Sequence, residues 1–422
     1  MKIPVTLGDV MYVYGSFGLN LDYTVRLFLQ LKDTIDSKIL SEALVKTQQR
    51  YPYLSLRLRK DEKEYYYEEN PAPVTLHHTD EKIRLNAEET NYHIWAVCYN
   101  EDRLYLDIYH GALDGTGMYK VLSTLLFYYC ADRYGVSDHT GINTLEDPIL
   151  PEESLDPSDA MPPIDPALLQ NSVYDEAFSL IKDGGSKPSS QRITDIKIPE
   201  AAFVKFSSAH DASPGTMVCI LMSRTIDALY PERTKDLISS YVINARPMLN
   251  APHTHHNCVQ TVFFNYTDRI KAMPFDRQCT VHRGTTFIQS DADLIKMKMQ
   301  AKANSMKMLL DRLPTIEMKK QTFAQMLSGG KLYFTYMVSY VGKWKFKQLE
   351  PYILEFWTHV PIANDLVTEI ASISGNICLS IHQDFEGDSV ANAFLKELEK
   401  NNIPYEIKKS VLSDVSSFAD AV

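Results

Sequence analysis

The alternation of hydrophobic and polar residues changes its period around residue 110. Hydrophobic residues occupy every second position of residues 104–108, the pattern of a strand with one buried face. Between residues 118 and 129 they recur every three or four positions, which indicates an amphipathic helix. The chain is therefore predicted to leave a buried strand at His110 and to enter a helix near Thr116, with Asp114 in the turn.

The same two periods predict further elements on both sides of this turn. Asp36 and Ser37 are good N-caps for a helix, and the Ser-Pro pair at residues 213–214 has the residue types that open another. Strands are predicted over residues 22–32, 54–58, 92–99, 192–198, 239–246, 332–342 and 377–381, and helices over residues 37–50, 290–312 and 388–400 and from residue 214 onward.

A change of composition in the middle of the chain indicates a connection between domains. Proline and acidic residues gather between residues 148 and 166, and a Gly-Gly-Ser-Lys-Pro-Ser-Ser run follows at residues 184–190. At 422 residues the chain is also longer than one typical domain of roughly 100–200 residues. Two domains are therefore predicted, over residues 1–185 and 186–422.

Charge and cysteine content exclude some classes of partner. The chain carries 43 Lys and Arg against 54 Asp and Glu, a formal net charge of −11 at pH 7, which argues against a nucleic-acid or anionic-membrane surface. No apolar run approaches the ~18 residues of a membrane span, and the N-terminus lacks the pattern of a signal peptide. Six cysteines without a Cys-x-x-Cys pair fit free thiols in a reducing compartment. We therefore expect a cytoplasmic protein.

His110 and Asp114 are the first candidates for chemistry. An imidazole titrates near neutral pH, and here it ends a buried strand and precedes Gly115 and Gly117, where the backbone can be approached closely. From the residues alone, His110 is either a catalytic base or a buried histidine bound to backbone groups. Asp114 is either a second catalytic group or the N-cap of the following helix.

Residues 109–115, Tyr-His-Gly-Ala-Leu-Asp-Gly, resemble the His-His-x-x-x-Asp-Gly motif of the CoA-dependent acyltransferase superfamily. This superfamily includes chloramphenicol acetyltransferase, the condensation domains of peptide synthetases and the alcohol acetyltransferases. Tyr109 replaces the first histidine, as in branches that keep only the second, catalytic histidine. Further matches are an Arg-x-Pro-x-Leu stretch at residues 50–54, a strand that ends at Arg246, and short motifs at residues 256–259 and 338–342. The Asp-Phe-Gly-Trp-Gly motif of plant-type members is absent.

The resemblance implies an α/β fold of two similar chloramphenicol acetyltransferase-like halves, each a two-layer sandwich, with the active site in a tunnel between them. It implies that His110 is the general base and that Asp114 points away from the reacting centre to pair with Arg246. It also implies that no cofactor is held and that acyl-CoA is a cosubstrate. The other site residues implied are Gly115 in the motif turn, Gly111, Ser339 and Gly342 as oxyanion or donor-binding candidates, and Asn257 in the second-half motif.

Together these features predict an acyltransferase that moves an acyl group from a thioester, acyl-CoA, to a small-molecule alcohol or amine. A thioester is already activated, so the reaction chiefly needs a base near the acceptor, and a neutral imidazole suits that task. No Ser or Cys lies in a recognisable nucleophile elbow, which favours direct transfer. Two alternatives stay open: a condensation-type enzyme whose donor rides on an acyl carrier protein, and a non-catalytic member that binds a small molecule or partner between the halves.

Two other clusters, one of histidines and one of lysines, are interpreted as structural features rather than as sites. His253, His255 and His256 lack acidic partners at metal-ligand spacing, so no metal site is predicted. The lysines within residues 343–347 are interpreted as the charged outer face of an edge strand, with contact to CoA phosphates as the alternative. The donor is expected to approach past residues 339–342.

Overall fold

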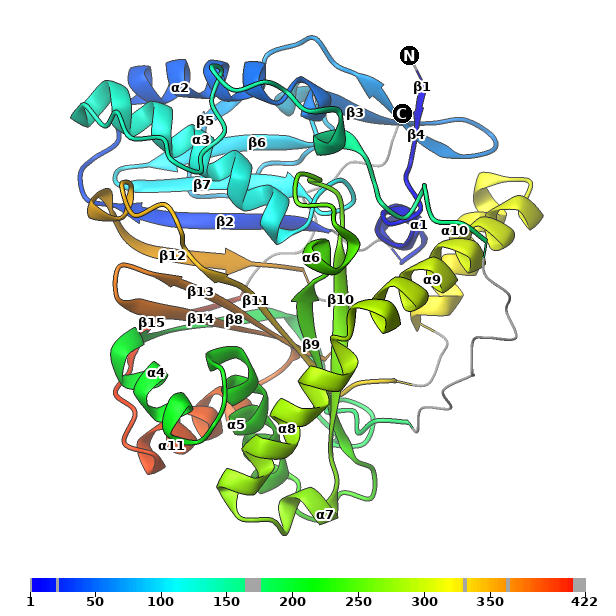
Figure 1. Ribbon diagram of the computed structural model, residues 1–422, viewed down its shortest axis with the longest axis vertical. Helices are drawn as coiled ribbons and strands as arrows, with labels where there is room; N and C mark the ends of the chain where they lie inside the picture. The colour runs from blue at the N-terminus through cyan, green and yellow to red at the C-terminus, as the bar shows by residue number, and fades with distance from the viewer. Residues whose placement is uncertain (1, 20–22, 164–175, 329–331, 362–364, 413–422) are drawn as a thin grey trace.

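The computed structural model describes residues 2–19, 23–163, 176–328, 332–361 and 365–412, which form two layered α/β halves (Figure 1). The first half contains β1 (Lys2–Pro4), α1 (Val10–Leu19), β2 (Thr24–Leu31), α2 (Ser37–Arg50), β3 (Leu56–Lys60), β4 (Tyr65–Glu69), β5 (Leu76–His78), β6 (Trp95–Asn100), β7 (Arg103–Tyr109) and α3 (Gly115–Tyr134).

The second half has more elements, and one of them returns to the first half. They are β8 (Pro188–Pro199), α4 (Glu200–Ala209), α5 (Pro214–Leu229), β9 (Leu237–Asn244), α6 (Arg246–Leu249), β10 (Val259–Tyr266), α7 (Asp268–Lys271), α8 (Phe275–Gln289), α9 (Ala292–Arg312), α10 (Ile316–Ser328), β11 (Tyr336–Lys343), β12 (Ile353–His359), β13 (Leu366–Ile373), β14 (Asn376–Phe385), α11 (Ser389–Lys400) and β15 (Glu406–Leu412).

The main sheet of the first half has the strand order β12-β2-β7-β6-β5, and α2 and α3 pack side by side over it (Figure 1). Strand β7 pairs antiparallel with β2 on one side and β6 on the other. Its alternating residues Leu104, Leu106 and Ile108 are fully buried. The intervening residues from 105 to 109 are buried too, so the single buried face predicted from the alternation is wrong: the strand is covered on both sides. Since β7 is held on both edges, it fixes the position at which the chain turns at His110.

The sheet of the second half has the order β10-β9-β11-β13-β14-β8-β15. Helices α5 and α11 cover one face, where the apolar run over residues 217–222 forms one hydrophobic cluster with residues of β13 and β14 such as Ile370 and Leu379. The opposite face is turned toward the first half, because Ala371 and Cys378 belong to the hydrophobic cluster of that half.

One strand crosses between the halves. Strand β12 follows β11 in sequence but pairs antiparallel with β2, where Phe356 lies opposite Leu29. The next strand, β13, is again in the second sheet. The domain boundary near residue 185 stays a prediction, and a segment far beyond it supplies an edge strand to the first sheet.

Most of the elements predicted from periodicity are present. Asp36 caps α2 by accepting from the backbone N–H groups of Lys38 and Ile39, and Ser213 caps α5. Residue 22, at the start of the strand predicted over residues 22–32, lies outside the described residues. The periodicity did not indicate β12 or β13; every residue of β13 is buried, so it has no alternating pattern. Within the described residues, no helix is both long and apolar enough to span a bilayer.

Candidate active site

The end of β7 places His110 at the junction of the two halves. Its backbone N–H donates to the carbonyl of Tyr23 at 2.8 Å, and its carbonyl accepts from the side-chain amide of Asn257 at 2.8 Å. The imidazole stacks on the ring of Tyr12, with centroids 4.5 Å apart and planes 13° from parallel. The first half thus holds the backbone N–H and the ring of His110, and a residue of the second half holds its carbonyl.

The surroundings of His110 favour the neutral imidazole. Burial lowers its pKa, and the nearby carboxylates of Asp114 and Asp9 and the carbonyls of His110 and Leu113 only partly oppose this effect. Its Nδ1 is buried and makes no hydrogen bond of normal geometry within the described part of the chain. Part of the ring nevertheless stays accessible. An uncharged, reachable imidazole is what a general base for an alcohol or amine requires.

Asp114 lies in the turn with its carboxylate directed away from solvent. It caps α3 by accepting from the N–H of Gly117 at 3.0 Å, and it accepts from the N–H of Cys258 at 3.0 Å. Its two oxygens also accept from Nη1 and Nη2 of Arg246 at 2.7 and 2.8 Å. These four hydrogen bonds occupy the carboxylate, so it has little capacity left to serve as a second base. The ion pair predicted between Asp114 and Arg246 is present.

Arg246 uses every donor of its guanidinium, and those that bind Asp114 join the two halves. Besides Asp114, it donates to the carbonyls of Thr254 and His256 at 3.0 Å each and to Asn244 Oδ1 at 3.3 Å. The Arg246 and Asp114 side chains are only 3% and 1% exposed. A planar guanidinium with five fixed donors suits this position better than a lysine would. The β9–β10 connection is therefore folded around the arginine.

Asp9 completes the support of the turn. Its carboxylate accepts from Asn257 Nδ2 at 2.6 Å and pairs with Nδ1 of His256 at 2.8 Å. Burial opposes charge on His256, yet Asp9 raises the pKa of this histidine to about 9. Asn257 therefore links Asp9 to the backbone of His110. Asn257 belongs to a motif that the sequence contains, whereas Asp9 precedes α1 and belongs to none, so no sequence signal indicates it.

Gly115 is required by a close approach of the second half. A Cβ atom at this position would lie 2.6 Å from Cγ2 of Val341 on β11. A Cβ at Gly117 would lie 2.4 Å from the carbonyl oxygen of His255. The motif glycines therefore let α3 begin directly against β11 and the β9–β10 connection.

We expect Gly115→Ala to destabilise the protein by about 1–3 kcal/mol, because the added methyl group overlaps Val341. The double variant Gly115→Ala/Val341→Ala should recover most of that loss, since it removes the atom in the way. Urea unfolding of the four forms measures both effects. An equal cost of Gly115→Ala in the two backgrounds would show that the contact is not the cause.

The candidates for binding the oxyanion or the donor, Gly111, Ser339 and Gly342, have different surroundings. The carbonyl of Gly111 accepts from the hydroxyl of Tyr67 at 2.8 Å. Ser339 on β11 lies opposite Glu369 of β13, and Gly342 has a positive φ of 109°. Lys343 forms an ion pair with Glu200 at 2.7 Å rather than standing free. A role of these residues in binding the oxyanion or donor stays a prediction.

The three neighbouring histidines do not converge on one point, and two of them have partners of their own. His255 lies against the hydroxyl of Tyr53 and the carbonyl of Glu153, and burial lowers its pKa to about 3. His256 pairs with Asp9, while His253 is exposed. Residues 2–19, 23–163, 176–328, 332–361 and 365–412 contain no group of three or more His, Cys, Asp or Glu side chains arranged to hold a metal.

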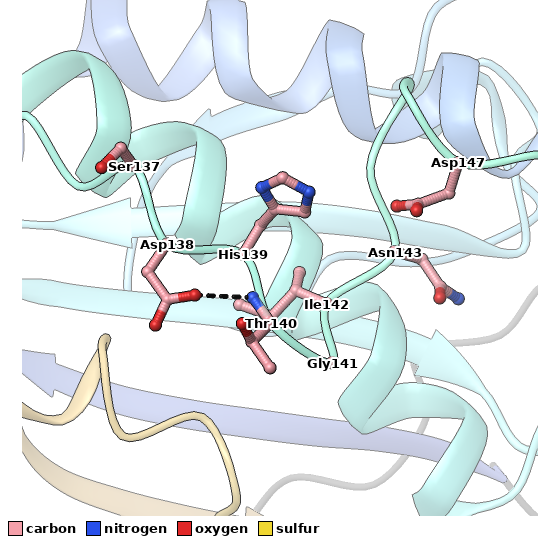
Figure 2. Close-up of a pocket in the computed structure, with 8 residues that line it drawn as sticks. All are labelled: Ser137, Asp138, His139, Thr140, Gly141, Ile142, Asn143 and Asp147. Atoms are coloured by element: carbon pink, nitrogen blue, oxygen red, sulfur yellow. Dashed lines mark hydrogen bonds between the residues drawn. The ribbon is translucent and has the colours of Figure 1, made fainter.

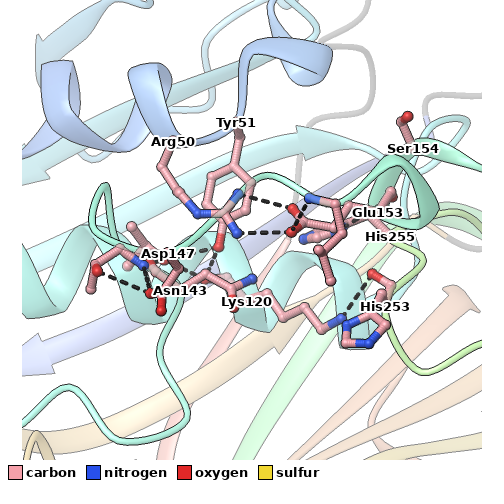
Figure 3. A network of polar contacts seen from close by, with 12 residues as sticks. Arg50, Tyr51, Lys120, Asn143, Asp147, Glu153, Ser154, His253 and His255 are labelled. Atoms are coloured by element: carbon pink, nitrogen blue, oxygen red, sulfur yellow. Dashed lines mark hydrogen bonds and ion pairs between the residues drawn. The ribbon is translucent and has the colours of Figure 1, made fainter.

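A buried ion pair ties the central connecting segment to the first half (Figure 3). Arg50, from the Arg-x-Pro-x-Leu stretch, donates from both Nη atoms to Glu153 at 2.9 and 2.8 Å. The hydroxyl of Tyr53 donates to the same carboxylate at 2.7 Å. Lys120 of α3 donates to the carbonyls of Pro252 and His253 at 3.1 and 3.0 Å. This network positions the loop that carries Asn257 over the motif turn.

A cleft gives access to the outer side of the turn. It has a volume of about 780 Å³, lies between the β3–β4 hairpin and residues 153–154 and 255–256, and reaches Ala112. A second cleft of about 810 Å³ shares Ile3, Pro4, Thr6 and Ser154 with it. A further pocket, lined by residues 137–143 and 147, lies beside the C-terminal half of α3, where the carbonyl of Asn143 accepts from the hydroxyl of Thr124 at 2.7 Å (Figure 2). Thr124 is ten residues beyond Asp114, so this contact is ~15 Å along the helix from the motif turn.

This architecture is the fold of the CoA-dependent acyltransferases and condensation domains, and solved structures of both match nearly the whole chain. F. graminearum TRI101 complexed with coenzyme A and deoxynivalenol has a TM-score of 0.63 at 12% identity, covering 96% of this chain and 99% of that one. The first condensation domain of the calcium-dependent antibiotic synthetase has a TM-score of 0.64 at 13% identity, covering 97% and 99%.

A third similar structure is the starter condensation domain of rhizomide synthetase RzmA in complex with C8-CoA. Its TM-score is 0.62 at 10% identity, and the match covers 95% of this chain and 94% of that one. No protein-family model and no curated protein match the sequence itself. The fold implied by the resemblance of residues 109–115 is thus present, although the sequence identity to the solved structures is low.

Proposed function

We propose that this protein transfers an acyl group from a thioester, acyl-CoA, to a hydroxyl or amine, with His110 as the general base. The observation that carries the proposal is a neutral, reachable imidazole in a turn fixed at the junction of the halves by the Asp114–Arg246 ion pair. The structural neighbours that were solved with coenzyme A or C8-CoA support a CoA thioester as the donor.

The proposed reaction needs one proton to move twice. The imidazole of His110 takes the proton from the acceptor hydroxyl or amine as that atom attacks the thioester carbonyl carbon. The tetrahedral intermediate carries a negative oxygen, for which Ser339 or a backbone N–H near Gly111 or Gly342 is the candidate donor. Collapse of the intermediate breaks the carbon–sulfur bond, and the imidazolium returns its proton to the leaving thiolate. The products are the ester or amide and a free thiol.

Incubation with a panel of acyl-CoAs and candidate alcohols and amines tests this proposal, with release of free CoA thiol as the readout. We expect thiol release that depends on the acceptor and is lost in His110→Ala. The second candidate, a condensation-type enzyme with a carrier-bound donor, is favoured by the two condensation domains among the neighbours. Faster reaction with an acylated carrier protein than with the matching acyl-CoA would select that second candidate.

The pH dependence of kcat/KM should report the protonation of His110. Burial lowers the pKa of this imidazole below its usual 6.5, so the free enzyme holds the base form throughout the neutral range. We expect kcat/KM to be level from about pH 7 upward and to fall on acidification with a midpoint below 6.5. A limb whose midpoint lies above 7 would contradict the neutral, buried imidazole.

A further inference from the structure

Glu369 is a buried acid on the face of the second sheet that is turned toward the first half. Residues of β13 alternate between two environments: Leu366 and Ile370 belong to the hydrophobic cluster under α5 and α11, and Ala371 and Ile373 to that of the first half. Glu369, Ala371 and Ile373 are every second residue of the strand and therefore project from the same face. The side chain of Glu369 thus lies between the halves. It is only 7% exposed.

Within the described part of the chain, Glu369 has no cationic partner. Ser339 lies opposite it on β11, on the same face of the sheet. Ser380 lies opposite it on β14 but donates to Asp195, at 2.6 Å. Among the described residues, no lysine, arginine or histidine pairs with Glu369. Burial accordingly raises its pKa to about 8, and the nearby Ser339 hydroxyl opposes this effect only in part.

This lack of a cation sets Glu369 apart from the acids that hold the fold together. Asp107, Asp114 and Glu153 are equally buried, and each forms two hydrogen bonds with an arginine: Arg26, Arg246 and Arg50, respectively. A carboxyl group removed from water without a cation is destabilising unless it stays protonated. The position is therefore poorly explained by stability alone.

Glu369 is also close to the helix that carries the motif. Its cross-strand neighbour Ser339 is two residues from Val341, which lies against Gly115 at the start of α3. One turn further along α3, Tyr119 is near enough that Glu369 adds to the effect of burial in raising the pKa of its phenol. Tyr119 also packs on Trp344 and Phe356, with ring centroids 5.8 and 4.9 Å away. Aromatic faces attract organic cations, so rings in the neighbourhood of a carboxyl group can add to its affinity for such a ligand.

We propose that Glu369 binds a positively charged nitrogen of the acceptor. The substrate then provides the cationic partner that Glu369 lacks among the described residues. This inference rests on the proposed function and adds the substrate class, an alcohol or amine that carries a second, cationic nitrogen. When the cation arrives, Glu369 releases its proton to solvent and pairs as a carboxylate. The acylated atom is the other hydroxyl or amine of the same molecule, at His110.

Matched pairs of ligands that differ only in charge test the proposal. Trimethylammonium alkanols with spacers of increasing length are compared with their neutral tert-butyl isosteres by calorimetry on the full chain at pH 7. We expect at least one cation to bind roughly 10- to 100-fold more tightly than its isostere, the range for a contact with a charged group. Titration in two buffers of different ionisation enthalpy should show proton release with the cation and none with the isostere.

The variant Glu369→Gln should remove the preference. Glutamine has the shape of the protonated acid, so the fold and the binding of neutral isosteres should persist, while the affinity for the cation falls to that of its isostere and proton release disappears. Ser380→Ala, the matched control on the neighbouring strand, should keep the preference. Thermal unfolding of each variant verifies that it is folded.

Several outcomes would overturn the inference: equal binding of cations and isosteres by the wild type, an undiminished preference in Glu369→Gln, or no binding of any cation by the folded protein. Thiol release from acyl-CoAs separates this failure from that of the proposed function. Turnover of neutral acceptors without charge preference would reject Glu369 and retain the acyltransferase. A charge preference that Glu369→Gln removes, without thiol release from any donor, would retain the cation site and reject the acyltransferase.

Discussion

Replacing His110 by alanine is expected to lower kcat by about 10²- to 10⁴-fold, the usual contribution of a general base. The imidazole is the base that takes the acceptor proton, and water in its place is a much weaker base. The fold should persist, because the hydrogen bonds that fix the turn use the backbone N–H and carbonyl of His110 rather than its ring. Loss of the stacking contact with Tyr12 is the main structural cost.

The measurement is steady-state thiol release with the best donor and acceptor pair, together with thermal unfolding of the variant. His253→Ala is the matched control, because this histidine is exposed in the neighbouring loop and its carbonyl, not its ring, contacts Lys120. The control should retain wild-type turnover. Near-wild-type turnover of His110→Ala would remove the base from the proposed mechanism.

Breaking the Asp114–Arg246 pair is expected to cost about 3–5 kcal/mol of stability from either side. Arg246→Ala leaves a buried carboxylate with only the N–H groups of Gly117 and Cys258. Asp114→Ala leaves a buried guanidinium with carbonyl and amide oxygens but no charge partner, and it also removes the cap of α3. Both variants should lose activity, because the turn that carries His110 is no longer tied to the second half.

The double variant should be less unstable than the sum of the two single variants, because it leaves no unpaired buried charge. Urea unfolding at pH 7 of the four forms gives this coupling energy. Arg57 and Glu68 provide a matched control, since they form a pair of similar length, 2.6 Å, with side chains that are 35% and 33% exposed. Their coupling should be at most about 1 kcal/mol. Strictly additive costs for Asp114 and Arg246 would refute the structural role of the pair.

The sequence predicts the motif turn well because its cause is local. Alternation in β7, an Asp cap and a helical period in α3 all lie within about thirty residues, and the structure contains the three together. The partner of Asp114 is 132 residues away, and no periodic pattern connects them. That pairing was predicted from the resemblance to the superfamily, which supplied the long-range contact that local physics does not encode.

Asp9 and Glu369 show why the rest of the site was missed. Asp9 precedes a helix whose residues are apolar on most sides, so nothing in its neighbourhood distinguishes it from a surface acid. Glu369 lies in the run Leu-Val-Thr-Glu-Ile-Ala-Ser-Ile, where a polar residue normally indicates a solvent-facing position. Only the arrangement of both sheets shows that this face is covered.

The crossing strand β12 imposes an order on biosynthesis. Until the ribosome has added residues 353–359, strand β2 has one unpaired edge, although every other strand of its sheet was made more than 240 residues earlier. At about 5–20 residues per second this interval lasts on the order of 10–50 s. An open strand edge is a template for pairing with other chains. The nascent first half is therefore a natural client for chaperones, and a chain truncated before β12 should aggregate rather than accumulate as a folded fragment.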